Sequence, residues 1–417
     1  MQENTLFLLM ETLAVLILAG LGLCLLHALV NLSLFRRLRP IPIPGNPKNQ
    51  TEEDFLPVSV LVPARNEEQR IHACLTSLIR QEPPVREIIL LDDRSSDRTA
   101  EIAAELVFSE KGRLRLIPGG ELPPGWVGKN WACHQLSQAA AAESTHLLFT
   151  DADTIHDPAC VRTALNHAGT QRADLLSLWP DQITGTWSEK WVIPLGYLLF
   201  MAFQAFPMLA WLQADPSRVK RWNFSAGKLA SMGAANGQFL LFLRSTYAAI
   251  GGHEARKDHL VEDVAFGRRI AAGTGEGLRL VNADGIELLR CRMYSGFEEL
   301  WEGFSKNLRP VFEESFVSFF LFGVMLGGLF LSPFLFLLIS WHLPGLLIPS
   351  LTAIFLIYLI RLVLTLRFRT SWAGFFAHPF GMGLALLIAV NSWRLCLGKG
   401  VSWKGRTYPI GGRVKGS

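Results

Sequence analysis

Two aspartates, one residue apart, directly follow a short apolar run with polar residues at both ends. The run covers residues 145–150, and Asp151 and Asp153 come after it. A run of this kind predicts a buried strand, and in open α/β sheets ligands bind beyond the carboxyl ends of strands. If the segment continues extended, residues i and i+2 point to the same side, so the two carboxylates repel unless a cation lies between them. The pair suggests a site for Mg²⁺ or Mn²⁺, which suit oxygen ligands; a solvated turn closing the strand is the alternative.

Three further stretches with polar or charged side chains lie earlier in the chain, and the first two directly follow apolar runs. Residues 63–68 (PARNEE) come after the first run, where a strand opening into a helix presents backbone N–H groups to a ligand. Residues 92–99 (DDRSSDRT) follow the second run, and Asp92 or Asp93 could accept a hydrogen bond from a base or a ribose hydroxyl. In residues 125–131 (GWVGKNW), the glycines permit close approach and Lys129, at a helix start, offers a point charge for phosphate.

Two more patterns lie in the second half of this region. Residues 235–238 (ANGQ) lead into an apolar strand, and Glu262 and Asp263 form an acidic pair. This pair precedes a helix that carries Arg268 and Arg269, so ordinary acidic charge at a helix N-terminus is the alternative to a catalytic role.

The elements that must position these residues alternate between strand and helix from residue 57 to about 289. Strands are expected at 58–62, 87–91, 114–117 and before Asp151, with helices at 67–79, 99–107 and 129–142. Such alternation predicts an α/β fold, a mostly parallel sheet with helices on both faces.

Long apolar segments flank this region. Residues 6–34, 316–339, 343–366 and 372–395 are each long enough to span a bilayer. Arg36, Arg37 and Arg39 follow the first segment and predict a cytosolic position for the next domain. Residues 191–212 are apolar but interrupted by prolines, so we expect an interfacial helix or hairpin on the bilayer, with a buried core helix as the alternative.

These boundaries divide the 417 residues into a series of parts. We expect an N-terminal transmembrane helix (1–35), a Pro-rich linker (36–56), the α/β domain (57–309, including 191–212), C-terminal transmembrane helices (310–397) and a basic tail (398–417). The formal net charge of +4, without a broad basic tract, argues against a nucleic-acid partner. The six cysteines are scattered, with no CxxC pair, which is typical of a reducing cytosolic setting.

Together, in this order and spacing, the motifs resemble the membrane-bound family 2 glycosyltransferases with the GT-A fold. The resemblance covers about residues 57–309 and depends on PARNEE, DDRSSDRT, the Asp-x-Asp and the late Glu-Asp. Within that family the chain is most similar to bacterial carotenoid glycosyltransferases (chlorobactene and diaponeurosporenoate) and to hopanoid-associated ones. That narrower similarity depends on residues 124–132, 235–239, 251–254, 261–263 and 403–406.

The resemblance implies a role for each candidate residue. Asp263 would be the general base of an inverting transfer, with Glu262 beside it, and Asp153 would bind a divalent metal, helped by Asp151. The donor would be a UDP-sugar, with glucose as the expected sugar. It would be held by residues from all the early motifs: Pro63, Ala64, Arg65, Glu67, Asp92, Asp93, Lys129 and Asp151. His253 and His259 are candidates to lie near the base, or are ordinary loop histidines.

The resemblance also implies the setting and the partners. The protein would be a multi-pass protein of the inner (cytoplasmic) membrane with a cytosolic catalytic domain, and would act on a lipid acceptor such as a carotenoid or other isoprenoid. One departure is that no Q/R-x-x-R-W motif follows Asp263, which argues against a processive polysaccharide synthase. A polyprenyl-phosphate glycosyltransferase and a non-catalytic membrane scaffold remain as alternatives, the first because Arg218, Lys220 and Arg221 could bind a phosphate.

Overall fold

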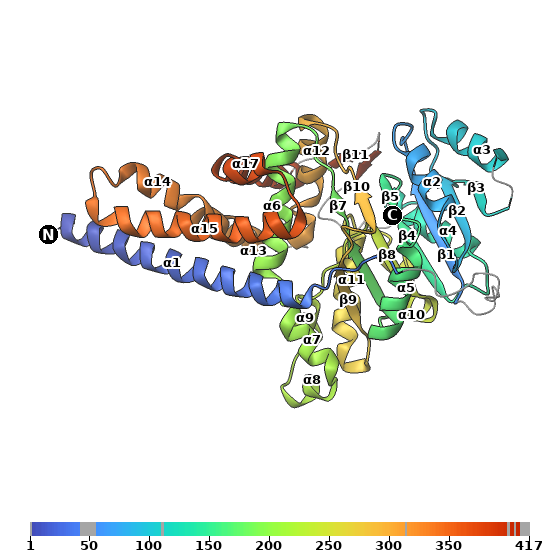
Figure 1. The fold of residues 1–417 in the computed structure, drawn as a ribbon, viewed down its shortest axis with the longest axis horizontal. Coiled ribbons are helices and arrows are strands. Elements are labelled where there is room, and N and C mark those ends of the chain that lie inside the picture. The colour runs from blue at the N-terminus through green and yellow to red at the C-terminus, as the bar shows by residue number, and fades with distance from the viewer. Residues whose placement is uncertain are drawn as a thin grey trace. The chain divides into compact units, whose positions relative to one another are not determined.

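The chain folds into two compact units (Figure 1). The computed structural model describes residues 2–41, 56–109, 112–312, 315–397, 401–403 and 406–408. The α/β unit comprises Phe35–Ile183 and Ala205–Met293, and the helical unit comprises Met1–Leu34, Thr184–Gln204 and Tyr294–Ser417. Residues 42–55 of the expected linker, and most of the basic tail, lie outside the described residues.

A seven-stranded sheet in the order β3-β2-β1-β4-β8-β6-β9 forms the centre of the α/β unit. Only β8 runs against its two neighbours, so the expected mostly parallel sheet is confirmed. The strands are β1 (Val58–Ala64), β2 (Val85–Asp92), β3 (Leu114–Pro118), β4 (His146–Thr150), β6 (Leu175–Trp179), β8 (Phe239–Leu243) and β9 (Leu280–Asp284).

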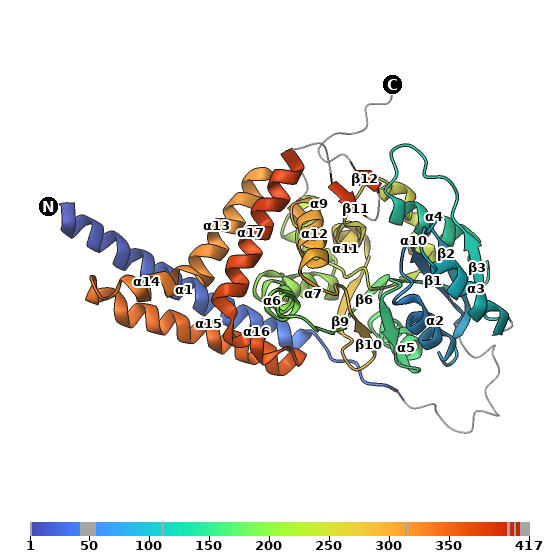
Figure 2. The ribbon, with the colours of Figure 1, turned by 90° about the horizontal axis from the view of Figure 1, so that it is seen from above.

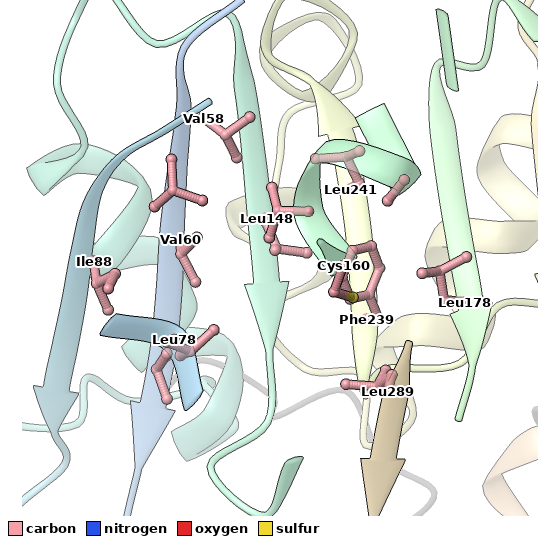
Figure 3. Close-up of a cluster of buried hydrophobic side chains, with 14 of the residues drawn as sticks. Val58, Val60, Leu78, Ile88, Leu148, Cys160, Leu178, Phe239, Leu241 and Leu289 are labelled. Atoms are coloured by element: carbon pink, nitrogen blue, oxygen red, sulfur yellow. The ribbon is translucent and has the colours of Figure 1, made fainter. Parts of the chain in front are cut away.

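Alternation along the strands divides the core between the two faces of this sheet. Val58, Val60 and Val62 of β1 pack on one face, against α2 (Ile71–Ile79), α3 (Thr99–Ser109) and α5 (Cys160–Gln171) (Figure 3). Leu61 points to the other face, where α4 (Gly128–Ala139), α10 (Arg244–Ala249) and α11 (Glu262–Ala272) pack. Both faces are thus covered, as the near-continuous apolar runs of the strands require.

A second, three-stranded sheet lies beside the end of β4. It has the order β5-β10-β7, with β5 (Thr154–His156), β10 (Leu289–Cys291) and β7 (Asp181–Gln182). Because β5 begins one residue after Asp153, this small sheet fixes the backbone on one side of the Asp151–Asp153 segment. Three short helices complete the unit: α7 (Phe206–Ala214), α8 (Ser217–Arg221) and α9 (Ala226–Ala230).

Among the described residues of the helical unit, three helical stretches are long and apolar enough to cross a membrane, over Met10–Leu34, Pro344–Phe368 and His378–Leu397. They belong to α1 (Gln2–Leu34), α15 (Leu347–Phe368) and α17 (His378–Leu397); α1 packs beside α15, and α13 (Phe316–Phe330) beside α17 (Figure 2). The remaining helices are α6 (Trp187–Phe203), α12 (Phe297–Asn307), α14 (Ser332–Ile339) and α16 (Trp372–Phe376).

Two of the expected apolar segments of this unit are broken in the described residues. Residues 316–339 form α13 and α14, which meet at Leu331, and residues 372–395 fall on α16 and α17, with the break at Ala377. Residues 191–212 likewise form two helices, α6 and α7. Buried polar side chains link the apolar helices: Arg361 donates to the carbonyl oxygens of Pro194 (3.2 Å) and Gly374 (3.0 Å). Such bonds are typical of helix contacts in an apolar setting.

Candidate active site

Lys129 brings together two carboxylates from distant parts of the sequence. Its ammonium lies 2.7 Å from Oδ1 of Asp151 and 2.8 Å from Oε1 of Glu262. Lys129 is in the first turn of α4, Asp151 follows β4 and Glu262 begins α11. These positions lie beyond the ends of sheet strands or at helix starts, where an α/β fold exposes side chains to a ligand.

The pKa values of Lys129 and Glu262 shift in opposite directions. Burial opposes the charge of Lys129, but the two adjacent carboxylates hold its pKa well above the ordinary value. Burial also opposes ionisation of Glu262, but the ammonium and its hydrogen bond lower the pKa of Glu262 below the ordinary value. Binding of phosphate by Lys129 stays a prediction; in the structure its ammonium forms ion pairs with Asp151 and Glu262.

Asp263 lies beside this cluster with both carboxylate oxygens hydrogen-bonded to the backbone. Oδ2 accepts from the N–H of Gly237 (2.8 Å), and Oδ1 accepts from the N–H of Val264 (2.8 Å). Burial and then the charge of Glu262 raise the pKa of Asp263 to about 6. A carboxylate of this kind is a stronger base than an ordinary aspartate and is still ionised at neutral pH.

The Asp151–Asp153 segment is a turn, so the strand does not continue through it as the expected placement of two carboxylates on one side required. The turn forms because the hydroxyl of Thr154 donates to the carbonyl oxygen of Asp151 (2.7 Å). The two carboxylates still interact, since burial and then the charges of Asp151 and Glu67 raise the pKa of Asp153 to about 7. Oδ1 of Asp153 is buried and has no hydrogen-bond partner among the described residues.

These residues fit a divalent cation that takes most of its ligands from elsewhere. Within the described residues, no group of three or more His, Cys, Asp or Glu side chains is arranged to hold a metal ion. Mg²⁺ and its relatives are commonly bound by one or two carboxylates together with substrate phosphates and water. The unpartnered oxygen of Asp153 and the unfavourable charge next to it are what such an ion would relieve.

The two loops that follow β1 and β2 are cross-linked by hydrogen bonds. The N–H groups of Asn66, Glu67 and Glu68 donate to the side chains of Ser95 (3.0 Å), Thr99 (2.7 Å) and Asp97 (3.1 Å). This corrects the expectation that the backbone N–H groups after β1 are presented to a ligand. α2 begins at residue 71, four residues after the expected start at 67.

Bonds to backbone carbonyl oxygens also join the two loops. Arg65 donates to the carbonyl oxygens of Asp93 (2.6 Å) and Arg94 (3.1 Å), and the N–H of Asp93 donates to Ala64 (2.8 Å), the residue after Pro63 in β1. Asp92 accepts a bond from the N–H of Ser95 (3.3 Å) through Oδ2, whereas its buried Oδ1 has no hydrogen-bond partner among the described residues. Asp92 thus has an acceptor atom available.

The two candidate histidines have different environments. His253 is buried, and its Nδ1 lies 2.8 Å from the hydroxyl of Tyr247. Burial lowers the pKa of His253 to about 3, so the ring is neutral. His259 pairs with Asp258 on the surface, and its carbonyl oxygen accepts from the side chain of Asn130 (2.9 Å). Neither arrangement is that of a cation beside Asp263.

Two functional candidates had no assigned role from the sequence: Gln238 and Cys291. Nε2 of Gln238 donates to Sγ of Cys291 (2.9 Å), and the Cys291 thiol is one of the groups that influence the pKa of Asp153. Gln238 belongs to a motif that the sequence singled out, but Cys291 carries no local signal, because only the pairing of β10 with β5 brings it to Asp153.

Comparisons with known proteins agree with this geometry. Residues 59–211 match the family described as glycosyl transferase family 2. The chain is 27% identical over 366 residues to the 4,4'-diaponeurosporenoate glycosyltransferase of Staphylococcus aureus (strain USA300). The alignment covers 85% of this chain and 88% of the relative. The family match and the sheet topology confirm the expected GT-A type of α/β fold.

Solved structures show weaker likeness. The mannosyltransferase PcManGT from Pyrobaculum calidifontis, in complex with GDP-Man and Mn²⁺, has a TM-score of 0.45 and 16% identity, covering 90% of this chain and 98% of that one. Glucosyl-3-phosphoglycerate synthase from Mycobacterium tuberculosis, with Mn²⁺ and UDP-glucose, has a TM-score of 0.36 and 17% identity, covering 67% and 89%.

Proposed function

Because this chain carries a family 2 glycosyltransferase domain and is a glycosyltransferase, we propose that it moves a sugar from a UDP-sugar to a membrane lipid. Glucose is the proposed sugar, and the proposed acceptor is the hydroxyl or carboxyl group of a carotenoid or other isoprenoid. The observation that carries this proposal is the gathering of Asp151, Glu262 and Asp263 around one ammonium, next to Asp153. The similarity to a glycosyltransferase named for a carotenoid acid supports the acceptor class.

Asp263 is the proposed general base. It would take the proton of the acceptor oxygen as that oxygen attacks the anomeric carbon of the sugar. Two backbone N–H groups hold the carboxylate in one orientation, and its pKa of about 6 keeps it ionised but basic at neutral pH. A single displacement assisted by a base inverts the configuration at the anomeric carbon.

Glu262 and Lys129 are the reason why the pKa of Asp263 differs from that of its neighbouring acid. Lys129 forms ion pairs with Asp151 and Glu262, at 2.7 and 2.8 Å, and offsets part of their charge. Glu262, with a lowered pKa, remains ionised, and its charge raises the pKa of Asp263. Glu262 would therefore tune the base without accepting the proton itself.

The donor would bind along the strand ends β1, β2 and β4. Pro63, Ala64, Arg65 and Glu67, from the first loop, would lie against the nucleotide. Asp92, with its unpartnered oxygen, and Asp93 would accept hydrogen bonds from the uridine. Asp153, with Asp151, would hold Mg²⁺ or Mn²⁺, which when bound offsets the charge that develops on the leaving diphosphate.

The helical unit supports a membrane-dissolved acceptor. Three of its helices are long and apolar enough to span a bilayer, and such helices keep an isoprenoid substrate and the enzyme in one phase. We propose a multi-pass protein of the inner (cytoplasmic) membrane, with the α/β unit in the cytosol because Arg36, Arg37 and Arg39 follow α1.

Turnover by detergent-solubilised protein tests this function. The protein is incubated with Mn²⁺, a bacterial lipid extract and, in separate reactions, UDP-glucose, UDP-galactose or GDP-mannose, and lipids are analysed by mass spectrometry. We expect a neutral or carboxylic isoprenoid heavier by one hexose, with UDP released. A hexosylated polyprenyl phosphate would replace the acceptor proposed here, and product with GDP-mannose alone would overturn the UDP-sugar donor.

A further inference from the structure

A hydrogen bond from outside α11 holds the residue that we propose as the general base. Within the described residues, two backbone N–H groups donate to the Asp263 carboxylate, and that of Val264 belongs to the next residue of α11. The other belongs to Gly237, which is 26 residues away and lies just before β8, and it donates to Oδ2 (2.8 Å). The orientation of the carboxylate relative to the sheet therefore depends on the position of the Gly237 peptide.

Residues 236–239 form a tight turn that leaves the N–H of Gly237 available. The N–H of Phe239 donates to the carbonyl oxygen of Asn236 (3.3 Å), and the N–H of Gln238 donates to Oδ1 of the same asparagine (3.0 Å). The second bond is that of an Asx-turn, in which the side chain takes the place of a backbone carbonyl group. Neither bond uses the N–H of Gly237, so this group can point to Asp263.

The amide groups of Asn236 and Gln238 fix each other's orientation. Because Oδ1 of Asn236 accepts from the backbone of Gln238, the other end of the Asn236 amide is its NH₂ group. That group donates to Oε1 of Gln238 (3.3 Å), which also accepts from Nε2 of Gln182 in β7 (2.7 Å). At the other end of the Gln238 amide, Nε2 donates to Sγ of Cys291 (2.9 Å). The side chain of Gln238 thus connects the turn to two strands of the small sheet.

The two strands beside β8 hold the backbone of this turn. Thr150, at the end of β4, donates through its hydroxyl to the carbonyl oxygen of Gln238 (2.7 Å). Ser177 of β6 accepts from the N–H of Asn236 (2.8 Å) and donates to its carbonyl oxygen (3.3 Å). Because Thr150 directly precedes Asp151, these bonds join the turn to the strand end that carries the Asp151 carboxylate.

We propose that Asn236 and Gln238 are positioning residues that hold the Gly237 N–H against the carboxylate of the general base. This inference rests on the proposed function. A catalytic group has to be kept within roughly 0.5 Å and 10–20° of its working geometry by residues that are themselves locked by hydrogen bonds. Gln238 is buried, and its side-chain bonds end within the turn and the small sheet, so it acts on the base through the Gly237 peptide.

Another buried glutamine shows what a purely structural amide looks like. The side chain of Gln81 donates to the carbonyl oxygens of Asp157 (2.7 Å) and Ser77 (3.3 Å) and accepts from the N–H of Val161 (3.1 Å). These bonds tie α2 to α5 and do not involve residues 236–239. Gln81→Leu is therefore a matched control, because it removes a buried amide with a similar set of bonds.

The pH dependence of lipid hexosylation tests the inference on the full-length detergent-solubilised protein, with UDP-glucose, a bacterial lipid extract and saturating Mn²⁺. Burial raises the pKa of Asp263 most, and the Gly237 N–H is among the groups that lower it. A carboxylate that loses an N–H donor is harder to ionise, so Gln238→Leu should move the acid limb of kcat/KM up by roughly one pH unit. Glu262 and Lys129, the charged side chains that act on Asp263, are unchanged in this variant. Gln81→Leu should keep the limb at its wild-type position.

Variants of Asn236 provide an independent arm of the test. Asn236→Ala removes the acceptor that closes the Asx-turn and should move the limb in the same direction. Asn236→Ser keeps an oxygen that can accept the same N–H, as serine does more weakly in such turns, and should recover part of the shift. These variants keep the test valid if Gln238→Leu unfolds, which thermal unfolding identifies. An acid limb that stays at or below its wild-type position in the folded variants overturns the inference.

The double variant with Asp263→Asn separates the possible failures. Gln238→Leu should lower kcat roughly tenfold in the wild type, but no further in the Asp263→Asn background, since both changes act through one carboxylate. An equal loss in both backgrounds would mean that Gln238 acts elsewhere, and would overturn the positioning role while the base assignment stands. If Asp263→Asn itself keeps the wild-type kcat and acid limb, the base of the proposed function is wrong, and the inference fails with it.

Discussion

Replacing Asp263 with asparagine changes one atom and removes the proposed base. In the wild type, both oxygens of Asp263 accept backbone N–H bonds, from Gly237 and Val264, each at 2.8 Å. The asparagine oxygen can accept one of these bonds, but its NH₂ group then faces the other N–H. A buried donor left without an acceptor costs about 1–3 kcal/mol, whereas loss of the buried negative charge acts in the opposite direction, because burial raises the pKa of Asp263. The net change in the free energy of unfolding should therefore be small.

The effect on catalysis should be much larger. Loss of a positioned base lowers kcat by roughly 10²–10⁴-fold, equivalent to about 3–5 kcal/mol of activation free energy. The pH dependence has a definite sign. The base works ionised, and with a pKa of about 6 it is about nine-tenths ionised at pH 7. At Mn²⁺ concentrations that keep the Asp153 site occupied at every pH, wild-type kcat/KM should fall about tenfold per pH unit below pH 6, and Asp263→Asn should lose this acid limb.

Initial rates of lipid hexosylation between pH 5 and 8 test both parts of this prediction. Asp258→Asn is the matched control, since Asp258 is a surface aspartate five residues earlier that pairs with His259. UDP binding and thermal unfolding of Asp263→Asn should stay near the wild-type values. If Asp263→Asn retains more than a tenth of the wild-type kcat, or keeps an acid limb near pH 6, the assignment of Asp263 as base is refuted.

Three other perturbations act on the same cluster. Lys129→Met should move the acid limb of kcat/KM to higher pH, because the charge of Lys129 lowers the pKa of Asp263; a limb that stays at or below its wild-type position would contradict this coupling. Gly237→Ala would bring a Cβ to 3.1 Å from Oδ2 of Asp263 and 3.3 Å from Nζ of Lys129, so kcat should fall roughly tenfold or more. The control is Gly169→Ala, on an open helix face, which should leave kcat unchanged and stabilise the fold by about 0.5–1 kcal/mol. Apparent Mn²⁺ affinity, measured by paramagnetic resonance, should weaken as the pH falls below about 7, since protons compete for Asp153, whose pKa is about 7; an affinity independent of pH from 5 to 8 would exclude Asp153 as the ligand.

Strand positions were predictable because the strands are buried on both faces. Each expected strand overlaps a strand of the sheet, with ends that differ by at most two residues, as for 58–62 against β1 (Val58–Ala64). The reversed direction of β8 was not predictable, since a buried apolar run carries no information about which neighbour it pairs with. β2 begins at Val85, whereas the sequence predicted a start at residue 87. The reason is that the polar Arg86 interrupts the apolar pattern although its backbone belongs to the strand.

The sequence identified individual candidate residues, but it did not show which of them contact one another. The sequence marked Lys129, Asp151 and Glu262 separately, because each follows a strand or begins a helix. Nothing in the spacing indicates that the lysine lies between the two acids, since that contact joins segments more than 100 residues apart. The turn at Asp151 was missed because the apolar run suggested continued extension, and it depends on the hydroxyl of Thr154. Cys291 was missed because a single cysteine has no sequence pattern to mark it.

The opposite pKa shifts of two adjacent residues give the strongest physical reason to assign different roles to them. Glu262 and Asp263 are neighbours in the chain at the start of α11, yet the pKa of Glu262 is lowered and that of Asp263 is raised. Lys129 explains the difference, because its ammonium touches Glu262 at 2.8 Å whereas Asp263 receives only backbone N–H bonds. Groups whose environments push their pKa values apart are suited to different tasks in one reaction. The acid with the raised pKa is the better proton acceptor, so Asp263, and not Glu262, is the residue whose amide variant should abolish the acid limb.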